Sequence, residues 1–77
     1  MPSMLDSALE IKSTLVRNMK KYRAKLRLTQ EAAAEKGDMT LKYWQRLEMI
    51  SQRDLPSLKM ISKIAKALEV PIWKLLQ

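Results

Sequence analysis

A helical stripe of apolar positions runs through the first third of the chain. Apolar residues recur there at i, i+4, i+7 and i+11, so they share one face of an α-helix. These residues are Leu15, Met19, Tyr22 and Leu26. The segment Ser7-Ala8-Leu9-Glu10 has the form of a capping box, which predicts that this first helix begins near Ser7. The predicted outer face carries the cations Lys12, Lys20, Lys21, Lys25 and Arg27.

Two short helices separated by a tight turn follow. Thr29 is a candidate N-cap for a helix over residues 30–36, and Gly37-Asp38 ends that helix. Thr40 then caps a third helix over about residues 41–49. Two helices joined by so short a turn cross at a large angle, so the second of them projects from the surface.

The last two helices lie beyond the longest loop, which includes the polar residues 51–54. Ser57 is the predicted cap of a fourth helix, and Pro71 fits the first turn of a short fifth helix over residues 72–77. The inner face of the fourth helix is predicted to hold Leu58, Ile61, Ala65 and Leu68. Since no segment alternates with the period of a strand, we expect an all-α fold of five helices.

The composition of the chain indicates a folded domain, and its charge indicates which binding partners it can attract. The 77 residues suit a single domain over 1–77, and 47% of them are apolar, so the chain can fold around a core. A net charge of +7 attracts polyanions, which are nucleic acid, an anionic membrane surface or an acidic protein. A basic surface that only keeps the chain in solution is the alternative.

The residue types that many enzymes use are missing from the chain. There is no cysteine or histidine, which removes thiolate chemistry, the commonest general base and the commonest metal ligand. Glu31, Glu35 and Asp38 are interpreted as the solvated flank of a short helix. We therefore expect no enzymatic activity, no catalytic residue, no metal and no cofactor. No segment is apolar enough to span a membrane and the first residues lack a signal-peptide pattern, so we expect a cytoplasmic protein without a membrane partner.

The third predicted helix has one apolar face and one polar face. At about 100° per residue, Trp44 and Leu47 point inward. The outward residues are Leu41, Lys42, Gln45 and Arg46. Lysine and arginine donate to guanine in the major groove and glutamine pairs with adenine, so this face suits DNA. An ordinary solvated helix face is the alternative.

The order and spacing of these residues resemble the Cro/repressor-type helix-turn-helix family, also called the XRE family. The resemblance covers about residues 15–76. It is carried by Arg23, Leu28-Thr29-Gln30-Glu31, Ala34, Met39, Thr40, Tyr43, Arg46-Leu47-Glu48, Pro56-Ser57-Leu58 and residues 63–68. It implies a compact lambda-repressor-like domain whose helix-turn-helix is formed by the second and third helices, about residues 29–49.

The resemblance also implies roles for particular residues. Arg23 and Glu48 match a buried ion pair between the first and third helices, although Arg23 is alternatively a phosphate-binding cation. The implied base-reading residues are Leu41, Lys42, Arg46 and, at the margin, Gln45. The implied contacts to the DNA backbone are Gln30, Thr40 and Tyr43, with Gln52 and Arg53 in the following loop.

Three positions depart from the family pattern. Ala33 stands where a large apolar residue is usual, and the large Trp44 is expected to compensate in volume. Asp38 stands where the turn usually has glycine, but aspartate tolerates the left-handed conformation. Ile50 replaces a usual glycine, and the loop that follows it is longer than in the family.

Apolar residues gather near the C-terminal end of the chain. They are Val70, Ile72, Trp73 and Leu76, and a short last helix cannot bury all of them within its own monomer. One interpretation is a dimer interface, because family members bind as two-fold dimers to half-sites about one helical turn apart. The other is packing of Trp73 against the first helix.

The function that the resemblance implies is sequence-specific binding of double-stranded DNA by a homodimer with its third helix in the major groove. Such a protein is a small transcriptional regulator, which includes repressors, restriction–modification controllers and antitoxins. With a single domain, no small-molecule effector is expected. The alternative is a protein-interaction module that uses the same fold without specific DNA binding.

Overall fold

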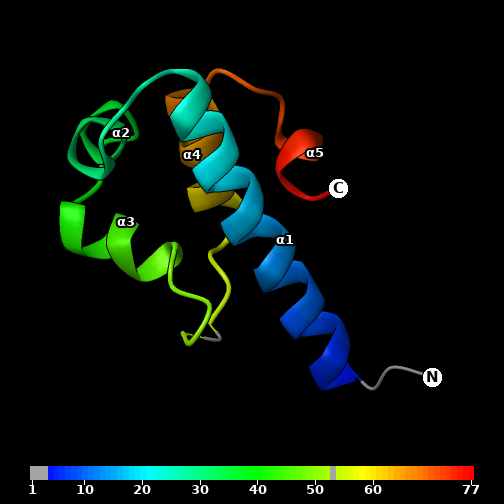
Figure 1. Ribbon diagram of the computed structural model, residues 1–77. Coiled ribbons are helices and arrows are strands. Elements are labelled where there is room, and N and C mark those ends of the chain that lie inside the picture. Colours follow the sequence, from blue (N-terminus) through cyan, green and yellow to red (C-terminus); the bar gives the residue numbers. More distant parts are fainter. Residues whose placement is uncertain (1–3, 53) are drawn as a thin grey trace.

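Five α-helices make up the part of the chain that the computed structural model describes, residues 4–52 and 54–77. They are α1 (Met4–Lys25), α2 (Gln30–Lys36), α3 (Leu41–Leu47), α4 (Leu58–Leu68) and α5 (Ile72–Leu75). The long α1 crosses in front of α4, with α2 and α3 on one side and α5 on the other (Figure 1). The predicted all-α fold, with a helix-turn-helix at α2 and α3, is confirmed.

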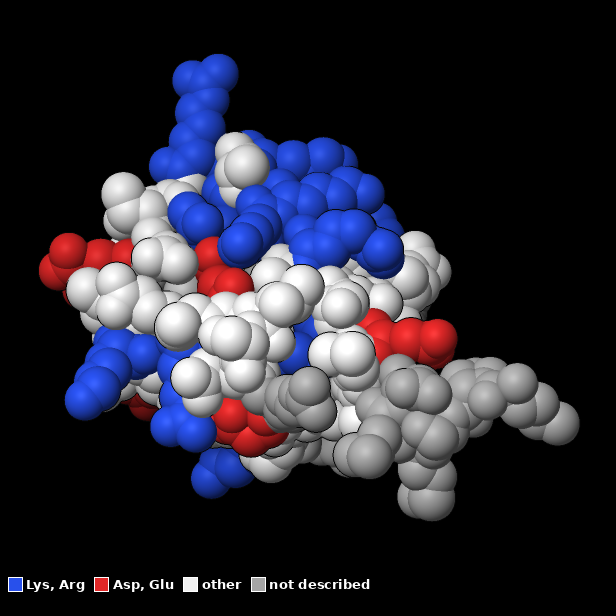
Figure 2. Space-filling model, turned by 60° about the horizontal axis from the view of Figure 1, so that its bottom comes forward, with Lys and Arg blue, Asp and Glu red and all other residues white. Residues whose placement is uncertain are grey.

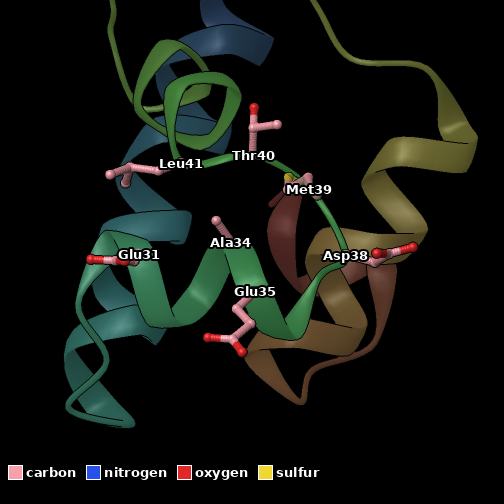
Figure 3. A pocket seen from close by; sticks show the side chains of 7 residues that line it. All are labelled: Glu31, Ala34, Glu35, Asp38, Met39, Thr40 and Leu41. Atoms are coloured by element: carbon pink, nitrogen blue, oxygen red, sulfur yellow. The ribbon is translucent and has the colours of Figure 1, made fainter.

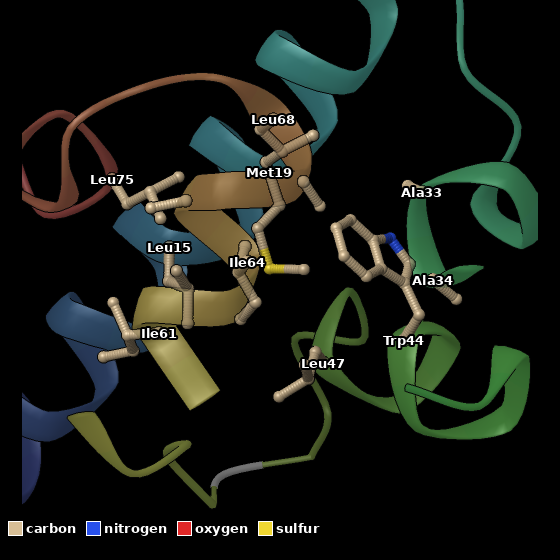
Figure 4. Close-up of a cluster of buried hydrophobic side chains, with 12 residues drawn as sticks. Leu15, Met19, Ala33, Ala34, Trp44, Leu47, Ile61, Ile64, Leu68 and Leu75 are labelled. Atoms are coloured by element: carbon tan, nitrogen blue, oxygen red, sulfur yellow. The ribbon is translucent and has the colours of Figure 1, made fainter. Parts of the chain in front are cut away.

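A single buried apolar cluster joins all five helices. Its members are Leu15, Met19, Ala33, Ala34, Trp44, Leu47, Ile61, Ile64, Ala65, Ala67, Leu68 and Leu75. Figure 4 shows the indole of Trp44 reaching toward Met19 and Ile64, with Ala33 and Ala34 on its other side. Trp44 and Ala33 are both fully buried in this cluster, as expected if the large side chain compensates in volume for the small one.

The first helix differs from its prediction at both ends and in its buried face. α1 begins at Met4, so the predicted capping box is wrong, because the backbone at Ser7 is already inside the helix and needs no cap. Leu26, the last residue of the predicted stripe, lies beyond the end of α1 and is exposed. Lys12 was predicted for the outer face but is only 1% exposed. Lys12 precedes Leu15 and Met19 at the i+3 and i+7 spacings, so it shares their buried face.

Threonine caps begin both helices of the helix-turn-helix, as predicted. Thr29 Oγ1 accepts a hydrogen bond from the Ala32 N–H at 3.0 Å, and Thr40 Oγ1 accepts one from the Tyr43 N–H at 3.1 Å. α3 ends at Leu47, earlier than predicted. The reason is that Glu48 leaves the helix as its C-cap, with φ −86° and ψ 5°.

In the turn between α2 and α3, one residue adopts the left-handed conformation and its neighbour allows close packing. Asp38 takes the left-handed conformation at φ 55°, as the sequence allowed, whereas Gly37 has an ordinary φ of −87°. Gly37 instead lies in a tightly packed place, since a Cβ there would lie 3.1 Å from Met39 Cε and 3.4 Å from Ala67 Cβ. The missing side chain therefore lets the turn pack closely against α4.

The fourth helix follows the prediction except at its first residue. Ser57 Oγ accepts a hydrogen bond from the Met60 N–H at 3.2 Å, which confirms the predicted cap. Ile61, Ala65 and Leu68 are buried, also as predicted. Leu58 was expected on the same inner face, and this is wrong, because it is 76% exposed. Leu58 opens the helix at the end next to the preceding loop, outside the apolar cluster.

Candidate nucleic-acid interface

The outer face of α3 presents three polar side chains around one hollow. Trp44 and Leu47 are fully buried, whereas Lys42, Gln45 and Arg46 are exposed. The three exposed side chains line a shallow surface hollow together with Met49 and Gln52. Three of the predicted base-reading residues and one predicted backbone contact are thus brought together by α3 and the residues that follow it.

The fourth predicted base-reading residue, Leu41, lies in different surroundings. It borders a second hollow, formed by α2, the turn and the start of α3 (Figure 3). The carboxylates that line this hollow belong to Glu31, Glu35 and Asp38. Leu41 is 37% exposed, so its side chain stands partly free at the edge between an acidic surface and the basic face of α3.

A buried carboxylate holds α1, α2 and α3 together behind this face. Arg23 binds Glu48 through both sides of the carboxylate, with Nε 2.9 Å from Oε2 and Nη2 3.1 Å from Oε1. The indole N–H of Trp44 also donates to Glu48 Oε2, and Gln30 Nε2 donates to Oε1 at 3.1 Å. The Glu48 side chain is only 1% exposed, so its negative charge depends on these donors. Arg23 Nη1 in addition donates to the Leu28 carbonyl at 3.0 Å.

The sequence anticipated Arg23 opposite Glu48 but missed the other two donors. Gln30 had been assigned to the DNA backbone, and Trp44 only to the core. The i, i+4 spacing of Trp44 and Glu48 along α3 is a signal that could have suggested their contact. Gln30 comes close to Glu48 only through the packing of α2 against α3, which no local pattern reveals.

The remaining predicted backbone contacts differ in exposure. Thr40 is exposed, and its hydroxyl serves as the cap of α3. Tyr43 is half-buried and packs against the apolar cluster, and Gln52 is also half-buried. Arg53 lies outside the described residues.

Asp54 is a site residue that the sequence analysis did not single out. Its carboxylate pairs with Arg46 on the outer face of α3, with Arg46 Nε 3.4 Å from Asp54 Oδ2. The main-chain oxygen of Asp54 accepts a hydrogen bond from Lys12 Nζ at 3.4 Å. Burial lowers the pKa of the Lys12 ammonium, the Asp54 charge raises it again in part, and the Arg46 charge lowers it. The loop before α4 is thereby connected to both α1 and α3.

Exposed cations also lie along the outer side of α1 and in the short loop that follows it. They are Arg17, Lys20, Lys21, Lys25 and Arg27, so the predicted basic face holds except at Lys12. Figure 2 shows lysine and arginine side chains gathered densely along one edge of the displayed surface, with uncharged side chains across its middle. A surface of this sign attracts the phosphates of a nucleic acid over distances longer than direct contact.

The C-terminal apolar residues separate into one that enters the core and others that do not. Leu75 is fully buried, and α5 is fastened to α1 by Asn18 Nδ2, which donates to the Leu75 carbonyl at 2.8 Å. Trp73 is 59% exposed, so its predicted alternative of packing against α1 is wrong, because Leu75 takes the inward position instead. Ile72 and Leu76 are also exposed, and Val70 packs partly buried against the cluster.

The described part of the chain was also compared with the requirements of a metal site and of a membrane span. Within residues 4–52 and 54–77, no group of acidic side chains is placed to hold a metal ion. None of the helices in that part of the chain has the length and apolar character of a membrane span.

These features define a class of protein. The second helix of a helix-turn-helix shows an exposed Lys-Gln-Arg face, which is the face that DNA-binding domains of this kind place in the major groove. The Arg23–Glu48 pair holds this helix from behind. A family model described as helix-turn-helix matches residues 19–72, most of the chain. The chain therefore belongs to the XRE-type helix-turn-helix family of DNA-binding regulatory domains, which confirms the resemblance found in the sequence. No curated protein and no solved structure matches the chain.

Proposed function

We propose that this chain is a transcriptional regulator that binds a specific double-stranded DNA sequence with α3 in the major groove. The observation that carries this proposal is the division of α3 into two faces. Trp44 and Leu47 anchor the helix in the core, while Lys42, Gln45 and Arg46 surround an open hollow. A helix of this width fits the major groove, where base edges present the acceptors and donors that these side chains match.

Within this proposal the base-reading residues have distinct partners. Lys42 and Arg46 donate to guanine, and Gln45 pairs with adenine. Leu41, partly exposed at the start of α3, meets the methyl group of a thymine. The contacts that set the position of the protein on the duplex come from Gln30, Thr40, Tyr43, Gln52 and Arg53.

The active form in this proposal is a homodimer. Ile72, Trp73 and Leu76 leave apolar surface exposed on and beside α5, and the large Trp73 is the most exposed of the three. A two-fold pair of these surfaces buries this apolar area and gives a pair of α3 helices that read two half-sites. Such a regulator acts on its chromosome in the cytoplasm, as a repressor, a restriction–modification controller or an antitoxin, without a small-molecule effector.

The proposal is tested by selecting bound sites from a random duplex library at about 150 mM salt, where non-specific binding is suppressed. We expect an enriched palindrome whose half-sites lie about one helical turn apart. An enriched sequence without two-fold symmetry would retain sequence-specific binding but reject the dimer. Binding without any enriched sequence, which fades as the salt concentration rises, would reject base reading and favour a protein-interaction module.

A further inference from the structure

Asp54 holds one edge of the Arg46 side chain. Arg46 Nε lies 3.4 Å from Asp54 Oδ2, and Arg46 Nη2 lies 3.5 Å from Asp54 Oδ1. Two carboxylate oxygens thus face two neighbouring nitrogens, which is the side-on arrangement of an arginine–carboxylate pair. The pair lies at the surface, with Arg46 55% and Asp54 51% exposed, beside the hollow that Arg46 lines.

The guanidinium of Arg46 has a second edge that Asp54 does not use. A guanidinium offers five N–H donors, and either the Nε and Nη2 pair or the Nη1 and Nη2 pair can hold two acceptors. Asp54 takes Nε and one N–H of Nη2, which leaves the other N–H of Nη2 and the whole of Nη1 without a hydrogen bond to the described part of the chain. Guanine presents O6 and N7 side by side in the major groove, so the second edge matches a guanine.

Lys12 fixes the segment of backbone that carries Asp54. Its Nζ reaches from α1 to the main-chain oxygen of Asp54 at 3.4 Å. Lys12 is 1% exposed as a whole residue, and an ammonium that has lost much of its contact with water needs a hydrogen-bond acceptor close by. The Asp54 carbonyl is that acceptor, so the loop is attached to α1 at the residue whose carboxylate contacts α3.

We propose that Asp54 is a specificity-determining positioning residue, which holds the side edge of Arg46 so that the end edge of the guanidinium faces a guanine. This inference rests on the proposed function, since it assigns a role within base reading. The acidic side chain repels DNA phosphates, so its presence in a loop next to the reading helix costs affinity for every sequence. The restricted orientation of Arg46 favours the correct base and thereby raises the ratio of specific to random binding.

The expected effect is moderate because the pair is exposed. Exposed ion pairs have small coupling energies, so removing the Asp54 charge is expected to lower the specificity ratio roughly two- to fivefold. Binding to random DNA is expected to strengthen at the same time, because one repulsive charge is gone.

The test compares Asp54→Asn with a matched charge control. The control is Glu69→Gln, which also removes one exposed carboxylate from a surface ion pair, the pair with Lys36 at 3.0 Å. Affinity is measured for the selected site, for the same site with its guanine replaced, and for random DNA. The same three affinities are measured with Arg46→Ala and with Arg46→Ala combined with Asp54→Asn, which closes a double-mutant cycle.

Asp54→Asn is expected to lower the preference for the selected site over the site with its guanine replaced, and Glu69→Gln is expected to leave this preference unchanged. When Arg46 is already alanine, Asp54→Asn should have no further effect on the preference. Equal strengthening on all three DNAs by both variants would overturn the inference, because Asp54 would then act only through its charge. A larger gain on the selected site than on random DNA would also overturn it, because Asp54 would then hold Arg46 away from the base. A wild-type protein without any sequence preference rejects the proposed function itself, and with it a base-reading role for Arg46.

Discussion

Two carboxylates, Glu48 and Asp54, each pair with an arginine, but Glu48 is buried and Asp54 is half exposed. Glu48 is 1% exposed at its side chain and accepts hydrogen bonds from Arg23, Gln30 and Trp44. Asp54 is 51% exposed, and its carboxylate pairs at the longer distance of 3.4 Å with Arg46. The same pairing chemistry therefore occurs once inside the helix-turn-helix and once on its outer surface.

The burial of each carboxylate determines what its pair with arginine can do. A buried charge without its partners is strongly unfavourable, so the Glu48 network constrains how α1, α2 and α3 pack. An exposed pair contributes little to stability because water competes for both charges, so the Asp54 pair leaves the fold almost unaffected. The inner carboxylate supports the fold, and the outer one can act on binding.

Loss of the buried Glu48 carboxylate should lower the stability of the protein more than any other change considered below. Glu48→Ala leaves the Arg23 guanidinium and the buried indole N–H of Trp44 without their acceptor. We expect a loss of about 3–5 kcal/mol in the free energy of unfolding, measured by urea denaturation. The free energy of unfolding of a small domain is only about 5–15 kcal/mol. If the wild type lies at the low end of this range, the variant will no longer show a cooperative unfolding transition.

The matched variant on the outer surface is Asp54→Ala, which we expect to change the free energy of unfolding by less than about 1 kcal/mol. The comparison between the two carboxylates would fail if the two alanine variants lost similar amounts of stability.

Removal of the Arg46 side chain should weaken DNA binding while the stability of the protein stays nearly unchanged. Arg46→Ala removes an exposed side chain that contacts Asp54. We expect it to weaken binding to the selected site by about 1–3 kcal/mol and to relax one base position. The unfolding free energy is expected to move by less than about 0.5 kcal/mol. Titration of specific and random duplexes measures this, and equal losses on both DNAs would argue against base reading by Arg46.

Gln30 connects the two regions, because it binds Glu48 and also opens α2 at the proposed DNA surface. Gln30→Ala removes one hydrogen bond to a buried carboxylate, so we expect a loss of about 1.5 kcal/mol in stability. Binding should weaken across all sequences alike, which affinity measurements on a panel of duplexes would detect. Gln45→Ala is the control, since that exposed residue should alter base preference without loss of stability. A change of base preference with Gln30→Ala would contradict the backbone role.

The sequence predicted the fold well where a local pattern decides the structure. Thr29, Thr40 and Ser57 act as caps because a short hydroxyl side chain reaches a free N–H at the start of a helix. Trp44 and Leu47 are inward because helical periodicity fixes their direction. The family resemblance added Arg23 and Glu48, which are 25 positions apart and which no local pattern connects.

The site was less predictable where residues meet through the packing of distant segments. Asp54 pairs with Arg46 because of the path of the loop before α4, and that path has no periodic signal. Lys12 is predicted for the outer face of the first helix and is buried, because its spacing to Leu15 and Met19 puts it on their face. Leu58 shows the opposite error, since an apolar residue at the right spacing stays exposed when it lies at the end of a helix beyond the core.

The smallest expected effect concerns Lys12, the residue behind the outer pair. Lys12→Met replaces a buried ammonium by an apolar side chain of similar length, so at pH 7 we expect stability to be unchanged or higher by about 1 kcal/mol. The pH dependence gives a sharper test. Burial lowers the pKa of Lys12 from its ordinary value of 10.5, with Asp54 raising it and Arg46 lowering it. Between the lowered pKa and 10.5 the unfolded chain therefore binds more protons at this residue than the folded one, so Lys12 makes wild-type stability rise with pH in that window.

The Lys12→Met variant lacks this contribution, so its unfolding free energy minus that of the wild type should fall as the pH approaches 10.5. Urea denaturation of both proteins at a series of alkaline pH values measures the difference, and the other lysines and the tyrosines cancel because both proteins carry them. A difference that stays constant over the whole series would mean that Lys12 keeps an ordinary pKa in the folded state. The ammonium would then be solvated, and the attachment of the Asp54 segment to α1 would have to come from other contacts.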